Sequence, residues 1–543
     1  MSDEIKKDQE GQSPAPAPEE TGTESTPTAG NPSRRDVLKG LASVPVLGVF
    51  FAGWYQKRLE AQAKREAIMA ELGISEGAPA VIENAISRSP GDRIRLGIIG
   101  NGGEGESLVR SAGYAHPDWV EDQRAAAADN PRHRGFATFM AQDDLNLDLT
   151  AVCDVFDVRA QRGLDAAANK IGPTAENSTA QATRFLRYTD MLESGEVDAV
   201  LIATPDHWHS QMCIDAAAAG VHVYVEKAMT REEEETHRMY DAIKNSDIVF
   251  QLGHQQRQTE SHIKAREVIE AGILGELTLV ETTTNRNDPW GAWVWDIHEE
   301  GNENTIDWEQ FEGPAPNKVP FDLDRFFRWR KYFDYGTGLS GDLFSHEYDA
   351  INQILDLGIP KTAVSSGGIY HFKDGRDVPD TWQAVLEYPD RNLTLVYSAT
   401  LWNGNWRGRV FMGHDATMEV DNGLTIRAEG SSTRYEEKIA EGLIDTSRPM
   451  FTFQPGFTGL DALTSATAEY FARRGLLYTY RGGRLTNAYH LHIAEWLDVI
   501  RNGGETSCNI ERGFEEAISC HMATRSYLEK RQVEWDPVAR RIV

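Results

Sequence analysis

Cysteine and basic side chains are both scarce in this chain of 543 residues. The four cysteines form neither a Cys-x-x-Cys pair nor a histidine-flanked pattern, so the sequence predicts no disulfide scaffold, no zinc site and no other bound metal. Lysine and arginine total 55 against 84 aspartates and glutamates, which gives a formal net charge of −29. Because nucleic-acid binding depends on basic groups that neutralise phosphates, this balance argues against a nucleic-acid partner.

Long apolar runs are also lacking. A mean hydropathy of −0.48 excludes a polytopic membrane protein. The apolar run over residues 41–54 is shorter than the roughly 20 residues that cross a bilayer comfortably. A hydrophobic fraction of 40% is typical of a globular protein, and the length predicts two or three domains.

The N-terminal ninety residues are predicted to precede the folded body. Residues 1–32 are rich in proline, alanine, threonine and glutamate without apolar periodicity, and we expect them to be disordered. Residues 33–63 combine the pair Arg34-Arg35 with the apolar run, a pattern typical of a twin-arginine export signal. Residues 64–90 are expected to form a linker or helix.

Alternatives for the signal stay open. The short apolar run favours a removable signal, but the candidate cleavage site Ala61-Gln62-Ala63 lies beyond Lys57 and Arg58, so a retained N-terminal membrane anchor stays an alternative. An ordinary buried helix with a basic start is a further alternative. We expect the twin-arginine machinery to be a partner, and the protein to be periplasmic or anchored to the outer face of the inner membrane.

A glycine-rich turn follows the strand predicted over residues 93–100. Such a turn lets backbone N–H groups and the next helix N-terminus approach a pyrophosphate. The predicted second strand, 149–153, ends in Asp154, which would bind the adenosine ribose and repel a 2′-phosphate, so NAD is favoured over NADP. Residues 114–148 are interpreted as an insertion, because Gly105 and Asp154 stand 49 positions apart where about 20 is usual. The turn's candidate cofactor-binding residues are Gly100, Gly102, Gly103 and Gly105.

Strands and helices alternate from there to residue 252. Strands are predicted at 198–204, 221–226 and 248–252, with a helix at 211–219 and a capping box of Thr230 and Glu233 before the next helix. This order predicts a doubly wound parallel sheet, an NAD(P)-binding Rossmann domain over 91–255, with ligands at the C-terminal strand ends. The candidate cofactor-binding residues there are Thr204, Pro205, His207, His209, Glu226, Lys227 and Arg257.

The pattern changes in residues 256–543. Strands that alternate apolar and polar residues are predicted at 276–284, 362–372, 381–387, 392–400, 409–412 and 416–421, which indicates an α+β domain with a large, mostly antiparallel open sheet. A helix predicted over 342–357 places Asp342 and His346 on one face, with Asp349 on the same side.

Three segments carry a family resemblance: IATPDHWHS at 202–210, HVYVEKA at 222–228 and GDLFSHEYD at 341–349. They resemble motifs of the Gfo/Idh/MocA family of NAD(P)-dependent oxidoreductases, and the similarity extends over about 93–537. The resemblance implies that Lys227, Asp342 and His346 are catalytic, with His346 moving the hydroxyl proton. Ala228 stands where that family usually has proline after an often cis peptide bond, which weakens any inference of a cis bond here.

The resemblance also implies a sugar, cyclitol or glycoside substrate and a homo-oligomer joined through the open sheet. The leading hypothesis is an oxidoreductase that transfers hydride between a hydroxyl carbon and a tightly bound cofactor. An NAD-dependent glycosidase of the same family and a non-catalytic NAD- or sugar-binding protein are the alternatives. Aromatic residues crowd 290–329, and core packing explains each of them as well as sugar stacking does. The candidate substrate-binding residues are Lys227, Trp290, Asp342, His346 and Asp349.

Overall fold

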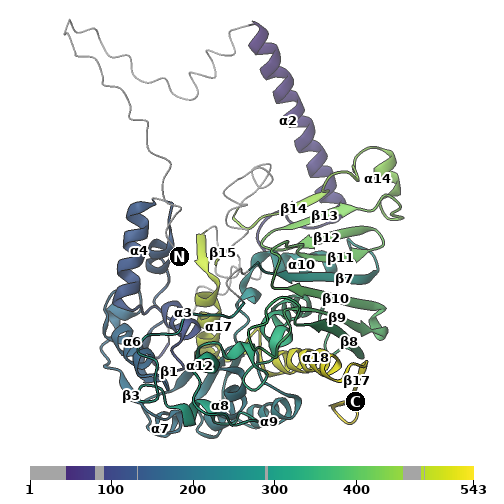
Figure 1. Ribbon diagram of the computed structural model, residues 1–543. Coiled ribbons are helices and arrows are strands. Elements are labelled where there is room, and N and C mark those ends of the chain that lie inside the picture. Colours follow the sequence, from purple (N-terminus) through teal and green to yellow (C-terminus); the bar gives the residue numbers. More distant parts are fainter. Residues whose placement is uncertain (1–44, 80–90, 131, 288–291, 457–477, 482–483) are drawn as a thin grey trace, which may run out of the picture. The chain divides into compact units, whose positions relative to one another are not determined.

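The computed structural model describes residues 45–79, 91–130, 132–287, 292–456, 478–481 and 484–543 (Figure 1). The chain divides into two units, 1–65 and 66–543. Helix α2 (Pro45–Leu72) begins in the first unit and ends in the second. Arg34 and Arg35 lie outside the described residues, so the export signal stays a prediction. Within the described part of the chain, every helix is too short or too polar to cross a membrane.

The first sheet of the second unit has six parallel strands in the order β3-β2-β1-β4-β5-β6. Every residue of β2 and β4 is buried, because helices cover both faces of the sheet. This confirms the doubly wound parallel sheet. The strands are β1 (Ile94–Ile99), β2 (Leu147–Cys153), β3 (Thr183–Phe185), β4 (Ala199–Ile202), β5 (His222–Val225) and β6 (Phe250–Leu252).

One helix of this sheet begins earlier than the sequence predicted. Helix α8 starts at Asp206 rather than Gln211, because extended Pro205 precedes a first turn whose acidic residue favours the helix N-terminus. The predicted insertion, 114–148, contains two helices. The helices are α3 (Gly103–Ser111), α4 (Pro117–Asp129), α5 (Gly135–Met140), α6 (Asp157–Ala168), α7 (Tyr188–Glu193), α8 (Asp206–Ala218) and α9 (Glu233–Lys244).

The capping box of α9 was assigned to the wrong pair. Glu232 and Glu235 form it, whereas the Thr230 hydroxyl lies 2.6 Å from the Thr236 hydroxyl and 3.0 Å from Nε2 of His521. Thr230 therefore joins α9 to a helix near the C-terminus, and a longer-range contact replaces the local cap that the sequence suggested.

The second sheet has ten strands and is mostly antiparallel, as predicted; β7 and β10 pair in parallel. Strands β13, β14, β17 and β18 were not predicted. In order across the sheet the strands are β14 (Phe451–Phe453), β13 (Leu424–Ala428), β12 (Ala416–Val420), β11 (Arg409–Gly413), β7 (Leu277–Asn285), β10 (Leu393–Thr400), β9 (Thr381–Tyr388), β8 (Thr362–Gly368), β17 (Val533–Asp536) and β18 (Arg541–Ile542).

Three helices pack on one face of this sheet: α10 (Glu260–Glu270) contacts β12 and β13, α13 (Ser345–Leu355) contacts β7, and α18 (Ile510–Glu529) contacts β8. On β9 the side chains of Trp382, Ala384 and Leu386 are buried against them, while the alternate residues are at least partly exposed. Helix α18 also contacts α9 and β6, so it packs against both sheets.

Short helices, a π-helical turn and a hairpin connect these parts of the fold. They include α11 (Trp308–Glu312), α12 (Leu323–Phe327), a π-helical turn η5 (Ser340–Phe344), α14 (Glu436–Ala440) and the hairpin of β15 (Tyr478–Arg481) and β16 (Arg484–Asn487).

Helix α17 (Ala488–Asn502) closes the first sheet although it lies far from that sheet in the sequence. Ile493, Trp496 and Leu497 are fully buried in the same core as β1 and β2, and the Trp496 indole N–H donates to the Val249 carbonyl at 3.3 Å. Figure 1 shows α17 beside α3, with which it is in contact. The Rossmann core therefore depends on the C-terminal part of the chain.

We predict that Trp496→Ala destabilises the protein by about 3–5 kcal/mol, because it leaves a large cavity between α17 and the first sheet. Equilibrium urea unfolding followed by circular dichroism measures the loss. Val538→Ala, at a side chain that is 94% exposed, is the matched control and should change stability little. Equal stability of the two variants would contradict the packing role of α17.

Candidate active site

The glycine-rich turn between β1 and α3 fits a dinucleotide. A Cβ on Gly105 would lie 2.1 Å from the Gly100 carbonyl oxygen, and Gly100 itself has a φ of +84°. By contrast, a Cβ on Gly103 would meet nothing within 4 Å, so there is open space above the turn. Because α3 begins at Gly103, its free N–H groups face that space and form a site for a pyrophosphate.

Asp154 joins this turn to the end of β2. Its Oδ2 accepts a hydrogen bond from the Asn101 N–H at 2.6 Å and its Oδ1 accepts one from the Phe156 N–H at 2.8 Å. Burial raises the pKa of this carboxyl group, against the opposing effect of the Arg159 charge. Asp154 therefore braces the glycine turn, and it also lines the cleft that begins there.

A cleft of about 770 Å³ begins at this turn and passes the C-terminal ends of β4 and β5 to reach the second domain. This volume is in the range of small-molecule sites. Tyr489 from α17 also lines it. The predicted residues that line it are Gly100, Gly102, Gly103, Asp154, Thr204, Pro205, Glu226, Lys227, Asp342 and His346.

Asp342 is the most heavily bonded carboxylate in the cleft. Lys227 Nζ donates to its Oδ1 at 2.8 Å, Arg330 Nε donates to the same oxygen at 3.1 Å, and the Trp293 indole N–H donates to Oδ2 at 2.9 Å. Burial alone would raise the pKa of Asp342, but the charges of Lys227 and Arg330 outweigh it and hold that pKa well below its usual range. Asp342 is therefore an anion that fixes Lys227.

Local backbone structure brings Lys227 and Asp342 together. The Lys227–Ala228 peptide bond is cis even though proline is absent, so the doubt raised by Ala228 was wrong. Asp342 lies in the π-helical turn η5 rather than in a continuous α-helix as predicted. A Cβ on Gly341 would lie 2.9 Å from the Ala228 Cβ, so glycine allows this turn to approach β5 closely.

His346 lies half-buried in the same cleft, one turn after Asp342. Burial lowers the pKa of its imidazole well below the ordinary value, and the positive charges of Lys227 and His254 lower it further. Its ring packs edge-to-face on that of His254, with centroids 5.5 Å apart. His346 is therefore a neutral imidazole, the form that can accept a proton.

A buried ion-pair cluster lies beneath His346. Arg257 Nη2 contacts Asp349 Oδ1 at 2.6 Å, and His254 Nε2 is paired with Glu516 of α18. The side-chain donors of His254, Asp349 and Glu516 lie within 4.8 Å of one another, a spacing that a metal ion can use. Because these atoms already bind one another or Arg257, we interpret the cluster as an ion-pair network that supports His346. Arg257 and Asp349 lie in this network and do not line the cleft.

His207 and His209 also lie behind the wall of the cleft. His207 donates to the Phe311 carbonyl at 2.8 Å, and burial lowers its pKa to about 3. The His209 ring is 2.8 Å from the Thr204 carbonyl and 2.7 Å from the Ala228 carbonyl, so it links the end of β4 to the cis peptide. Both histidines position neighbouring backbone. Trp290 lies outside the described residues.

Sequence reasoning missed the partners of Asp342 that come from segment 292–335. Trp293 and Arg330 belong to this segment, and the aromatic crowding of 290–329 was the signal that could have indicated them. The segment is anchored to the first sheet by a β-bridge between Phe156 and Ile306 and by a core of Phe156, Phe311 and Phe326. It forms the wall of the cleft opposite the glycine turn.

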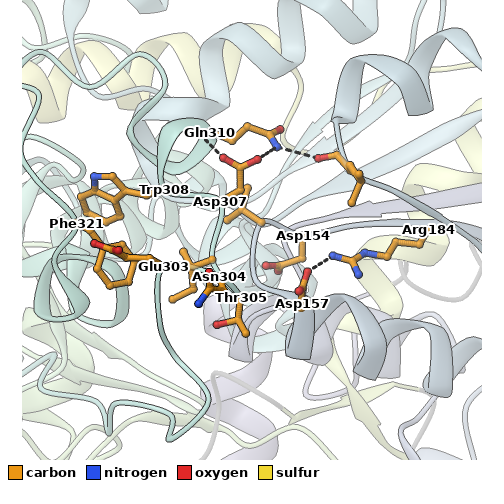
Figure 2. Close-up of a pocket in the computed structure, with 13 residues that line it drawn as sticks. Asp154, Asp157, Arg184, Glu303, Asn304, Thr305, Asp307, Trp308, Gln310 and Phe321 are labelled. Carbon is orange, nitrogen blue, oxygen red and sulfur yellow. Dashed lines mark hydrogen bonds and ion pairs between the residues drawn. The ribbon is translucent and has the colours of Figure 1, made fainter.

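A second cavity of about 550 Å³ is lined by Asp154 and by Ile306 of that bridge (Figure 2). Figure 2 shows Arg184 paired with Asp157, and Gln310 bonded to Asp307. Apart from Asp154, none of the predicted site residues that the structure describes lines this cavity. The predicted catalytic residues therefore belong to the larger cleft.

Comparison with known proteins agrees with this geometry. Residues 94–254 match the model of the Gfo/Idh/MocA oxidoreductase family, NAD-binding Rossmann fold. A levoglucosan dehydrogenase from Pseudarthrobacter phenanthrenivorans is 28% identical over 212 residues, which cover 37% of this chain and 45% of that protein. A glycosyl hydrolase family 109 protein from Shewanella baltica is 24% identical over 258 residues, 46% of this chain and 48% of that protein. The chain thus spans about half the length of these curated relatives.

Solved structures show the same fold over more of the chain. Levoglucosan dehydrogenase in complex with NADH and levoglucosan has 17% identity and a TM-score of 0.53, covering 82% of this chain and 99% of that one. The WlbA dehydrogenase from Bordetella pertussis with NADH and UDP-GlcNAcA has 16% identity and a TM-score of 0.50, covering 82% and 98%. These structures show the fold, and the match to the family model covers residues 94–254, the Rossmann domain.

We predict that Gly105→Ala weakens NADH binding at least about tenfold, because its Cβ would force the turn away from the Gly100 carbonyl. Quenching of intrinsic tryptophan fluorescence by added NADH measures the affinity. Gly430→Ala is the matched control, since a Cβ there meets nothing within 4 Å. NADH affinity in Gly105→Ala equal to that of Gly430→Ala would contradict the assignment of this turn.

We predict that His346 stays reactive toward diethyl pyrocarbonate at about pH 5.5, where N-acetylhistidine is largely protonated and slow. A lowered pKa leaves the imidazole neutral, and only the neutral form is acylated. His254→Gln removes a positive charge, so the His346 pKa should rise and labelling at this pH should fall. The other charged groups that act on the His346 pKa, Lys227, Asp342 and Arg286, are unchanged in this variant. Peptide mass spectrometry measures the labelling.

His262→Gln is the control for that experiment, because His262 is a buried histidine in contact with Arg409. Labelling of His346 that falls equally in both variants would show a general loss of packing rather than an effect of the His254 charge.

Proposed function

We propose that this chain, whose residues 94–254 form a Gfo/Idh/MocA-type NAD-binding domain, is an NAD-dependent oxidoreductase acting on a sugar, cyclitol or glycoside. The hydride passes between a hydroxyl-bearing carbon and a tightly held cofactor. One observation carries the proposal: Lys227, Asp342 and His346 meet in the cleft that begins at the glycine-rich turn. The levoglucosan dehydrogenase relative supports a CH–OH substrate.

The three side chains divide the proton chemistry. A bound NAD would supply the hydride acceptor, and the glycine turn and Asp154 would hold its pyrophosphate and adenosine ribose. Lys227, oriented by Asp342, donates a hydrogen bond to the substrate hydroxyl oxygen and stabilises negative charge that develops there. His346, kept neutral by its surroundings, accepts the hydroxyl proton. In the reverse direction the same groups return the proton.

We also propose that the protein is exported by the twin-arginine route and works in the periplasm or at the outer face of the inner membrane, as a homo-oligomer. Support comes from the Arg34-Arg35 pattern and from the half-exposed face of the second sheet. Free nicotinamide cofactor is scarce outside the cytoplasm, so an exported enzyme needs a cofactor that stays bound. Segment 292–335, which walls the cleft, is suited to retain it.

A glycosidase is the second candidate. The glycosyl hydrolase family 109 relative favours it, and the same three side chains would serve oxidation, elimination and reduction in one turnover. Release of an aglycone from a nitrophenyl glycoside without net formation of NADH would identify this activity. Net NADH formation from a free sugar would identify the dehydrogenase. A binding protein without catalysis would show neither.

The decisive experiment uses the purified full chain. We expect denatured protein to release stoichiometric NAD(H), and the native protein to oxidise levoglucosan or a related sugar. Lys227→Ala and His346→Ala should lose about 10²–10⁴-fold in kcat, because each removes a proton-transfer or charge-stabilising group, while both keep the bound cofactor. Wild-type turnover in either variant would contradict the assigned roles. Failure of the native protein to bind NAD(H) or NADP(H) would overturn the oxidoreductase proposal.

A further inference from the structure

The reacting end of the cleft carries more positive than negative charge. Its cations are Lys227, Arg330 and Arg286, and one carboxylate, Asp342, is bonded to the first two. Each cation that an anion does not neutralise costs free energy when a substrate displaces water from it, unless the substrate supplies the missing charge. The positive charge at this end of the cleft therefore indicates that the substrate carries negative charge.

The guanidinium of Arg330 is fixed at its Nε, and its two terminal nitrogens are free to bind a ligand. Its Nε donates to Asp342 Oδ1 at 3.1 Å, and its guanidinium lies 4.2 Å from the ring centroid of Trp329. Neither terminal nitrogen donates a hydrogen bond within the described part of the chain, and neither is fully buried. A planar guanidinium held this way presents two parallel N–H groups, which is the geometry that binds a carboxylate or a phosphate through two oxygens.

Arg286 adds a second cation to the lining of the same cleft. It follows directly after β7, where its backbone N–H donates to the Thr400 carbonyl at 2.9 Å, and its side chain is exposed and lines the cleft. No described acidic residue forms an ion pair with its guanidinium. Its charge reaches Asp342 and His346, because it lowers the pKa of both.

Neighbouring acidic residues do not remove the excess of positive charge at the reacting end of the cleft. Asp206 lies near Arg330, but its Oδ2 accepts hydrogen bonds from the Thr337 N–H and hydroxyl at 3.1 and 2.8 Å, and burial raises its pKa. Glu226 directly precedes Lys227 at the end of β5, but burial raises the pKa of its carboxyl group well above the ordinary value. Glu104, at the glycine turn, acts on Arg330 and raises its pKa, and Asp296 is exposed. The cofactor's own phosphates belong at the N-terminus of α3, whereas Arg330 is bonded to the catalytic Asp342.

We propose that the substrate is an anionic sugar, whose carboxylate or phosphate group is bound by Arg330 and Arg286 while its hydroxyl carbon faces Lys227 and His346. This inference rests on the proposed oxidoreductase function and narrows it from neutral sugars to sugar acids or sugar phosphates. The anion neutralises the two arginines and is held bidentately by the open edge of Arg330. Arg286 closes over the same group from the end of β7.

The test compares matched sugars on the full-chain protein with its bound cofactor. Glucose, glucuronate, gluconate and glucose 6-phosphate are assayed for NADH formation and, independently, for perturbation of bound NADH fluorescence. We expect one anionic sugar to exceed glucose in kcat/KM by about a hundredfold, with the advantage falling as salt increases. Glucuronate and gluconate identify a carboxylate ligand, and glucose 6-phosphate a phosphate ligand.

Arg286→Gln should raise KM for the preferred anion about ten- to hundredfold and reduce its preference over glucose, because a charge-assisted contact is lost. Arg407→Gln, at an exposed arginine outside the cleft, should leave the preference unchanged. Turnover of glucose without preference for any anion would overturn this inference and leave the oxidoreductase in place. Loss of NADH affinity rather than anion preference in Arg286→Gln would assign these arginines to the cofactor and overturn it too.

Binding distinguishes the two proposals. Anion-dependent perturbation of bound NADH that Arg286→Gln weakens, without turnover of any sugar, would support the anion site and contradict the oxidoreductase. If no anionic sugar binds in either assay, the anion site is wrong.

Discussion

The carboxylate of Asp342 is the interaction on which the rest of the site depends. It comes from the second domain, yet it binds Lys227 at the end of β5 in the first sheet. A buried anion of this kind is stable only when cations and N–H groups surround it, and Arg330 and Trp293 complete that shell. The nucleotide side and the substrate side of the cleft are therefore joined by one ion pair.

The elements behind the cleft explain why this ion pair can hold its geometry. Helix α18 packs against both sheets, and its Glu516 pairs with His254 directly beneath His346. The His209 ring fixes the carbonyls of Thr204 and Ala228, so the strand end that carries Lys227 is braced from behind. The site is built on strand ends and helices, which restrain side chains more closely than free loops do.

Local sequence patterns predicted the two sheets, and the family resemblance indicated Lys227, Asp342 and His346, which the structure brings together in the cleft. Apolar strands ending in Gly100, Asp154 and Lys227 are short-range signals, and so is the i,i+4 pair of Asp342 and His346. The missed features are long-range: the pairing of His254 with Glu516, the return of α17 to the first sheet, and Arg330 on Asp342. Strand β13 is an exception, since Asn422-Gly423 before it is a recognisable hairpin signal.

Electrostatics connects catalysis with substrate choice. Burial is the main reason that His346 is neutral, and the positive charges of Lys227, His254 and Arg286 lower its pKa further. The same positive charge is more than Asp342 can balance, so it attracts an anion to the reacting end of the cleft. A sugar acid or phosphate bound there would restore some proton affinity to His346 at the moment when the base must accept the hydroxyl proton. In the proposed function, the same charges thus favour an anionic substrate and adjust the pKa of the base that acts on it.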